Sequence, residues 1–287
     1  MAIYRKSEIN SRMAQIYAEK LARWPAAYES RCITTCFGRT HVLACGPVEA
    51  PPLLLLHGLA ITSMMWLPNI AALSERYRCY AVDVIGDYGR SELSKPWRFI
   101  LNAKGYSRWL DDVLDGLGIE RTHMVGASNG GFITLCQAIY APERVDHIVL
   151  LAPAGLNLTI KQILPRIFAY LLFPSDVRRA RLIEWFIGDH PSVRAANHEQ
   201  LWWGMQRVPR VAIPLIISRT RLRQIKAQSL FIFGEYDQVI PAETCSRRVT
   251  ASIPQAQVQV IPGAGHALNC EAGQVVDQHI LNFLAEV

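Results

Sequence analysis

Between Leu53 and Leu151 the sequence alternates short apolar runs with longer segments whose apolar residues recur at helical spacing. The runs are rich in Leu, Ile and Val and are too short to be helices, so they are predicted to be strands. They cover residues 53–56, 79–82, 123–125 and 148–151. Strands that alternate with helices in this way are typical of a mostly parallel sheet with helices on both faces. The pattern therefore predicts the α/β fold class.

The residues before the first run form two further patterns. Residues 8–24 have an apolar stripe at helical spacing, which predicts an amphipathic helix within an N-terminal extension of residues 1–30. Its members are Ile9, Met13, Ile16, Tyr17, Leu21 and Trp24. A helix of this kind docks on a membrane or a partner, or packs on its own domain, and we favour the last. Residues 31–45, broken at Gly38, predict a hairpin of two edge strands.

The alternation stops between residues 156 and 226, which contain no clear strand, several prolines and many large side chains. This segment has twelve Lys and Arg residues against four Asp and Glu, whereas the net charge of the whole chain is only +6. The basic character of the protein therefore belongs to this segment. No nucleic-acid motif accompanies it, so we expect a solvated face or mild attraction to anionic substrates or lipid headgroups.

A serine lies between a predicted strand and a predicted helix, in the sequence G-A-S-N-G at positions 126–130. A serine on such a sharp turn has a strained backbone and an exposed hydroxyl. The glycines two residues to either side leave room for the turn. The N-terminus of the helix that follows favours developing negative charge. The pattern predicts that Ser128 is a nucleophile.

Two partners for this serine follow it along the chain. A serine hydroxyl needs a nearby base, and the base needs an acid to orient it. Asp237 follows the apolar run at 230–234, and His266 lies in a turn after the run at 258–261. The carboxyl ends of parallel strands gather at one edge of a sheet. We therefore predict a catalytic triad of Ser128, Asp237 and His266.

The first apolar run ends in His57-Gly58-Leu59, which predicts an oxyanion hole. Glycine at this point lets the backbone approach a substrate. The two donors would be the backbone amides of Leu59 and Asn129, each contributing roughly 3–4 kcal/mol of transition-state stabilisation. We interpret His57 as a structural residue that braces this loop rather than as a catalytic base.

Together these elements resemble the α/β-hydrolase fold family, and in particular its serine carboxylesterases with a helical cap. The resemblance extends from about Arg31 to the C-terminus and rests on four ordered elements. These are His57-Gly58, the loop at 83–91, the Ser128 turn, and Asp237 with His266. The resemblance implies a core of residues 31–155 and 227–287. It also implies a helical cap, residues 156–226, inserted after the sixth strand.

The chain departs from the family pattern at two places. The loop at 83–91 is similar to the family's D-x-x-G-x-G-x-S but has one extra residue between the glycines. We expect this insertion to reshape the rim of the pocket. Glu271 is followed by Ala272-Gly273, where many relatives have a proline soon after, and we expect this difference to be neutral.

Large side chains of the cap are candidates for substrate binding. An apolar cap over a polar catalytic floor is the usual composition of a small-molecule pocket. The alternative, that these side chains form only the cap's own core, stays open. The candidates are Trp185, Phe186, Trp202, Trp203 and Met205.

Composition limits the remaining possibilities. Hydrophobic residues make up 51% of the chain, enough for a substantial core. No stretch approaches 18 consecutive apolar residues, and the first residues lack the apolar centre of a signal peptide. The seven cysteines fall mostly within strand or helix patterns, and no Cys/His cluster supports a metal site. We expect a cytoplasmic protein with reduced thiols, no metal and no organic cofactor.

The sequence thus predicts a carboxylic-ester hydrolase that acts on small to medium, largely apolar acyl esters through an acyl-enzyme intermediate. Three alternatives use the same residues: a carbon–carbon bond hydrolase, a cofactor-free perhydrolase, and a ligand sensor without turnover. Ala127 disfavours carbon–carbon cleavage, because hydrolases of that kind commonly have Asn before the nucleophile. We expect a small-molecule ester as the partner and no nucleic acid. The oligomeric state and the natural substrate stay open.

Overall fold

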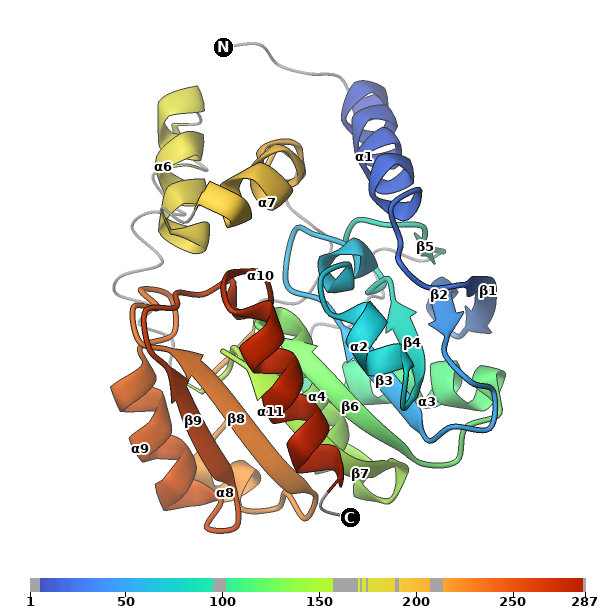
Figure 1. Ribbon diagram of the computed structural model, residues 1–287, viewed down its shortest axis with the longest axis vertical. Helices are drawn as coiled ribbons and strands as arrows, with labels where there is room; N and C mark the ends of the chain where they lie inside the picture. Colours follow the sequence, from blue (N-terminus) through green and yellow to red (C-terminus); the bar gives the residue numbers. More distant parts are fainter. Residues whose placement is uncertain are drawn as a thin grey trace.

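A nine-stranded sheet forms the centre of the structure (Figure 1). The computed structural model describes residues 6–94, 102–156, 170, 172, 173, 175–188, 191–206 and 214–285. The strands are β1 (Tyr28–Thr35), β2 (Gly38–Cys45), β3 (Pro52–Leu56), β4 (Arg78–Val82), β5 (Glu92–Leu93), β6 (Thr122–Ala127), β7 (Val145–Leu151), β8 (Gln228–Gly234) and β9 (Gln257–Ile261).

The strands lie in the order β1-β2-β4-β3-β6-β7-β8-β9, with β5 paired to β2. The strands from β4 to β9 in this order are parallel, whereas β2 pairs antiparallel with β1, β4 and β5. The predicted hairpin exists, but only β1 is an edge strand. The expectation of two edge strands is wrong for β2, which lies between β1 and β4. Its run Val42–Cys45 is fully buried, as an interior strand requires.

Helices cover both faces of the sheet. In Figure 1, α2 and α11 contact each other in front of the sheet, and α3 and α4 pack together behind it. The α-helices are α1 (Lys6–Leu21), α2 (Ile70–Ser74), α3 (Ala103–Leu117), α4 (Asn129–Tyr140), α6 (Asp176–Ile187), α7 (Pro191–Gly204), α8 (Arg219–Leu222), α9 (Ala242–Ser252), α10 (Leu268–Glu271) and α11 (Gly273–Ala285). Two 3₁₀ turns, η1 (Ser63–Trp66) and η3 (Pro142–Arg144), are also present.

The α/β fold class predicted from the sequence is confirmed. The central strands are nearly continuous apolar runs because helices cover both of their faces. In β3, for example, the side chains of residues 53–56 have no exposed surface. If the two-residue β5 is set aside, β7 is the sixth strand, and the chain leaves the sheet after it.

The predicted N-terminal helix forms as α1, and all six residues of its predicted apolar stripe are buried. Ile9, Met13 and Ile16 pack in a cluster with α6 and α7, whereas Tyr17 and Leu21 join the main core. The helix therefore connects the segment above the sheet to the core.

Helices α6 and α7 lie above the carboxyl ends of the parallel strands, with α1 beside α7 (Figure 1). They belong to the segment predicted to form a cap, of which residues 157–169, 171, 174, 189, 190 and 207–213 lie outside the described residues. The division into residues 1–30, 31–155 with 227–287, and 156–226 stays a prediction. Among the described helices, none is long and apolar enough to cross a membrane.

Candidate active site

Ser128 lies on the turn between β6 and α4, with the unusual backbone angles φ 51° and ψ −112°. The turn is tight because its glycines touch neighbouring backbone. A Cβ on Gly130 would lie 2.1 Å from the carbonyl oxygen of Leu56, and a Cβ on Gly126 would lie 2.5 Å from the carbonyl oxygen of Gly130. The amide of Ser128 donates to the carbonyl of Leu151 at 2.9 Å. Neighbouring backbone therefore holds this residue in a conformation that serine alone disfavours.

Asp237 and His266 lie next to this serine, in loops that follow β8 and β9. The Nε2 atom of His266 is 3.1 Å from Oγ of Ser128, and its Nδ1 atom is 2.8 Å from Oδ2 of Asp237. The other oxygen of Asp237 accepts hydrogen bonds from the amides of Val239 at 2.7 Å and Ile240 at 2.8 Å. The structure thus brings the three side chains of the predicted triad into one hydrogen-bonded chain.

The pKa of His266 lies above its usual value of 6.5. Burial alone lowers it, but the charge and the hydrogen bond of the adjacent Asp237 carboxylate, together with the charge of Glu271, raise it by more. The imidazolium form that a general base acquires is therefore stabilised by its surroundings.

Glu271 holds the loop that carries His266, a role that sequence reasoning missed. Its carboxylate accepts hydrogen bonds from the amides of Gly265 and, at 3.0 Å, Ala267, one on each side of the histidine. Helix α10, which ends at Glu271, thereby fixes the position of the imidazole. The signal in the sequence was a carboxylate five residues after a histidine in a glycine-rich turn.

His57 orients the peptide bond between Gly58 and Leu59. Its Nε2 atom accepts the amide hydrogen of Val84 at 2.9 Å, so Nδ1 carries the proton and donates to the carbonyl oxygen of Gly58 at 2.7 Å. Burial lowers the pKa of His57 and so favours this neutral form. In a trans peptide the N–H points away from the C=O, so fixing this carbonyl also fixes the direction of the Leu59 amide. This geometry supports the interpretation of His57 as a bracing residue.

The two predicted oxyanion donors belong to backbone segments next to the serine. A Cβ on Gly58 would lie 3.5 Å from Cβ of Ser128, so the turn that carries the Leu59 amide is in contact with the nucleophile. Asn129 is the first residue of α4. Its amide has no intrahelical acceptor, because the first amides of a helix point beyond its N-terminus.

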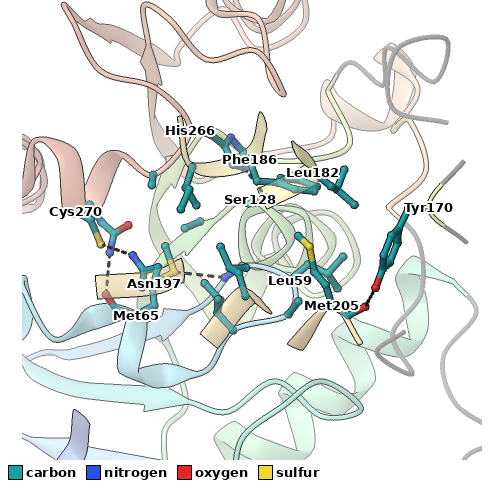
Figure 2. A pocket seen from close by; sticks show the side chains of 18 residues that line it. Leu59, Met65, Ser128, Tyr170, Leu182, Phe186, Asn197, Met205, His266 and Cys270 are labelled. Carbon is teal, nitrogen blue, oxygen red and sulfur yellow. Dashed lines mark hydrogen bonds between the residues drawn. The ribbon is translucent and has the colours of Figure 1, made fainter. Parts of the chain in front are cut away.

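A cavity of about 190 Å³ opens above Ser128 and His266 (Figure 2). Its walls are mostly apolar and come from the turn after β3 and from α6 and α7. The apolar residues that form these walls are Leu59, Ile61, Met65, Leu182, Phe186, Ile187, Leu201 and Met205. Asn197, Asn269 and Cys270 add polar groups, and the Asn197 side chain donates to the sulfur of Cys270 at 3.4 Å. The arrangement is an apolar chamber next to a serine that is hydrogen-bonded to a histidine.

The structure places two of the five predicted substrate-binding residues in this lining and three elsewhere. Phe186 and Met205 line the cavity, and the ring centroid of Phe186 is 6.4 Å from that of His266. The other three, Trp185, Trp202 and Trp203, are absent from the described lining of this cavity, and their role in substrate binding stays a prediction.

The three tryptophans have other neighbours. Trp185 packs edge-to-face on Phe186 with ring centroids 5.0 Å apart, and Trp203 packs in the cluster between α1 and helices α6 and α7. Trp202 stacks on His198 and lies under the guanidinium of Arg179. Adjacent residues of a helix point in different directions, so Trp185 does not share the orientation of its neighbour Phe186 toward the cavity.

Side chains at helical spacing line the cavity instead. Leu182 and Phe186 are four residues apart on α6, and Asn197, Leu201 and Met205 follow the same spacing on and just after α7. Residues four apart share one face of a helix. This periodicity was the available signal for the pocket face. In the described part of the chain, no group of three or more His, Cys, Asp or Glu side chains is placed to hold a metal ion.

Comparison with known proteins identifies the family. The model of the α/β hydrolase fold family matches residues 51–200. The chain belongs to the α/β hydrolase family. It is an enzyme, a serine hydrolase similar to the carboxylesterases.

Three relatives illustrate this similarity. Carboxylesterase YbfK of Bacillus subtilis (strain 168) is 33% identical, with 96% of this chain and 95% of the relative aligned. The crystal structure of naproxen esterase (carboxylesterase NP) from Bacillus subtilis is 32% identical and superposes with a TM-score of 0.86 over 98% of this chain and 99% of its own. The 2-hydroxy-6-oxo-6-phenylhexa-2,4-dienoate hydrolase of Burkholderia cepacia is 28% identical over 86% of this chain and 91% of the relative.

The contact between Gly130 and Leu56 leads to a prediction about stability. We expect Gly130→Ala to lower the free energy of unfolding by roughly 1–3 kcal/mol or more, because the new methyl group meets a backbone carbonyl that cannot move aside. Gly273→Ala is the matched control, since its Cβ would have no neighbour closer than 3.7 Å. We expect this control to change stability by less than about 1 kcal/mol. Urea unfolding measures both, and equal midpoints for the two variants would contradict the prediction.

Proposed function

We propose that the protein is a carboxylic-ester hydrolase that acts on small to medium, largely apolar acyl esters. The observation that carries the proposal is the hydrogen-bonded series Ser128, His266 and Asp237 at the floor of an apolar cavity. A nucleophile, its base and the orienting acid are what acyl transfer requires. The cavity offers an acyl chain apolar walls next to the nucleophile.

In the proposed mechanism, Ser128 attacks the ester carbonyl while Nε2 of His266 takes its proton. Asp237 holds Nδ1 in the protonated tautomer and stabilises the imidazolium ion. The amides of Leu59 and Asn129 hold the negative oxygen of the tetrahedral intermediate. His266 then protonates the alcohol that leaves, and water releases the acyl group with His266 again as the base.

The relatives support ester cleavage over carbon–carbon cleavage. The proteins named carboxylesterases align over nearly the whole chain at 33% and 34% identity, whereas the dienoate hydrolase is 28% identical. Ala127 before the nucleophile favours the same choice. We also propose a cytoplasmic location, supported by seven cysteines that are all free thiols.

A serine-directed phosphonate and an ester panel test the proposal. We expect intact-mass spectrometry to find one phosphonate adduct per chain, absent in Ser128→Ala, because only an activated serine reacts. The same variant should lose roughly 10⁴–10⁶-fold in kcat on p-nitrophenyl esters. Cys270→Ala is the matched control, since Cys270 is another nucleophilic atom in the cavity, and it should keep the adduct.

Other outcomes would support the alternatives. Turnover of a vinylogous diketone with no ester hydrolysis would indicate a carbon–carbon hydrolase. Peracid formation from hydrogen peroxide that outpaces hydrolysis would indicate a perhydrolase. A folded protein that forms no adduct and turns over none of these substrates would contradict catalysis and favour the sensor.

The pH dependence tests the role of His266. Because a base must be unprotonated, kcat/KM should rise with pH through the pKa of His266, which lies above 6.5. Glu271→Gln removes one negative charge that raises this pKa, so the acid limb should move to lower pH.

Glu235→Gln is the control for this shift. Glu235 accepts a hydrogen bond from Gly263 in the same loop at 2.9 Å, yet it is not among the groups that raise the pKa of His266. We expect this variant to leave the acid limb in place. A profile that is flat down to pH 4.5 in the wild type would rule out a histidine base.

The cavity lining predicts acyl-chain preference. Each methylene buried in an apolar pocket contributes about 0.8 kcal/mol, so kcat/KM should rise with chain length until the roof is reached. Phe186→Ala and Met205→Ala should move the optimum to longer chains, because both residues line the cavity. Trp202→Ala, a cap aromatic outside the described lining, should keep the wild-type profile. Identical profiles for all three variants would place the acyl chain elsewhere.

A further inference from the structure

The loop at 83–91 contains an extra residue, and the structure shows what that region contacts. Asp87 accepts hydrogen bonds from the amide of Ala60 at 3.1 Å and from its neighbour Tyr88 at 2.8 Å. The hydroxyl of Tyr88 donates to the carbonyl of Gly204, at the end of α7, at 2.6 Å. The loop therefore joins the turn after β3 to the end of a helix above it.

Asp87 reaches this turn from outside the catalytic cavity. It is absent from the described lining of that cavity and instead borders a separate polar hollow with Asn10 and Tyr17 of α1. Ala60, by contrast, lines the catalytic cavity. Asp87 therefore contacts the lining of the site through the backbone amide that it holds.

The backbone that it holds is the one next to the proposed oxyanion donor. His57 fixes the peptide before Leu59, through the carbonyl of Gly58. Asp87 fixes the peptide after Leu59, through the amide of Ala60. With both flanking peptides held, neither peptide next to Leu59 can rotate without breaking one of these two bonds.

The conformation of Ala60 shows that this restraint is needed. Its φ is 61°, a left-handed value that costs a residue with a side chain roughly 1–2 kcal/mol. Such a conformation persists only where the surroundings impose it. The carbonyl group of Ala60 is confined as well, because a Cβ on Gly204 would lie 2.6 Å from the carbonyl oxygen of Ala60.

We propose that Asp87 is a positioning residue that aims the Leu59 amide at the oxyanion, and that its ionised carboxylate does so better than its protonated form. The proposal rests on the proposed function, since it concerns the same acyl-transfer site. A carboxylate accepts a hydrogen bond from an amide more strongly than a neutral acid does. The Ala60 amide is therefore held more firmly when Asp87 is charged.

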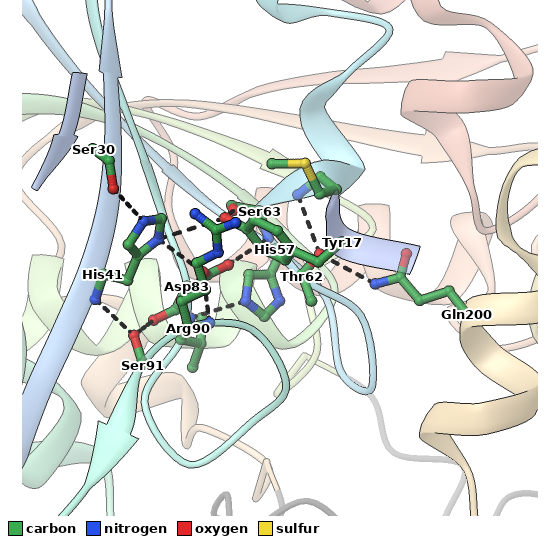
Figure 3. Close-up of polar contacts among 12 residues, drawn as sticks. Tyr17, Ser30, His41, His57, Thr62, Ser63, Asp83, Arg90, Ser91 and Gln200 are labelled. Atoms are coloured by element: carbon green, nitrogen blue, oxygen red, sulfur yellow. Dashed lines mark hydrogen bonds and ion pairs between the residues drawn. The ribbon is translucent and has the colours of Figure 1, made fainter. Parts of the chain in front are cut away.

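The surroundings of Asp87 bring its ionisation into the neutral to alkaline range. Burial, with a smaller contribution from the charge of Asp83, raises the pKa of Asp87 to about 8, although the two amides lower it in part. Asp83 lies on the same loop but has the imidazole of His41 at 3.0 Å, and its pKa is lowered despite burial (Figure 3). Among the described residues that line the hollow beside Asp87, the other titratable side chains are Tyr17, Tyr88 and Arg90.

Kinetics as a function of pH test the proposal. In the wild type, kcat should rise through two ionisations, that of His266 and a second near pH 8. Asp87→Asn keeps the shape and one acceptor but has no charge, so the second rise should disappear. At pH 9.5 this variant should have roughly ten-fold lower kcat, less than the 10²–10³-fold loss that follows removal of a whole oxyanion donor. KM should change little, since the Leu59 amide acts on the transition state.

Glu92→Gln is the matched control. Glu92 is an exposed acid that directly follows the same loop, and its carboxylate pairs with Arg39. It should keep both ionisations and the wild-type kcat. A folded Asp87→Asn variant with the wild-type kcat and pH profile would overturn the proposal. If that variant does not fold, a wild-type profile with a single ionisation between pH 6 and 10 would overturn it equally.

A measurement without substrate separates this proposal from the proposed function. The amide signal of Ala60 in the ¹H–¹⁵N spectrum of the wild type should shift with pH around 8 and should not shift there in Asp87→Asn. The Ala60 signal could titrate in a protein that neither hydrolyses esters nor reacts with a phosphonate. In that case the proposed function fails, while the contact between Asp87 and Ala60 holds. An Ala60 signal independent of pH in the wild type would overturn the Asp87 proposal alone.

Discussion

The site depends on one close approach, that of the first turn of α4 to the end of β3. Gly130 lies so near the carbonyl of Leu56 that no larger residue fits without displacement of backbone. This approach forces the chain between β6 and α4 through the unusual angles of Ser128. It also brings the turn after β3, with the Leu59 amide, beside the serine. The proposed nucleophile and the proposed oxyanion donors thus owe their relative positions to one packing contact between a helix and a strand.

Carboxylates shape the remaining loops at this edge of the sheet. Four of them each accept hydrogen bonds from two backbone amides, and each joins a loop to its neighbour or fixes a turn. The donors are Val239 and Ile240 for Asp237, Ser63 and Arg90 for Asp83, Ala60 and Tyr88 for Asp87, and Gly265 and Ala267 for Glu271. Asp83 and Asp87 differ in whether an imidazole lies next to the carboxylate. Asp83 has one and its pKa is lowered, whereas Asp87 has only amides and its pKa is raised.

The sequence predicted the parts of this arrangement that local patterns encode. The parallel strands, the serine turn, and the carboxylate and histidine that follow later strands all have signals within a few residues. The substrate side of the pocket was harder, because large side chains on short helices do not reveal which helical face points inward. Phe186 lines the cavity while its neighbour Trp185 packs against it. The role of Asp87 was not visible either, since it depends on contact with Ala60, 27 residues earlier in the chain.

Contacts between the N-terminal helix α1 and α7 hold one wall of the pocket in place. On α1, Arg12 pairs with Glu199 of α7, and Lys20 donates to the side chain of Gln200 at 2.7 Å. The apolar residues of α1 pack in the same cluster as Leu201 and Val193 of α7. Movement of α7 away from the site would break these contacts and the hydrogen bond from Tyr88 to Gly204. The wall formed by Asn197 and Leu201 is therefore held by the core through α1.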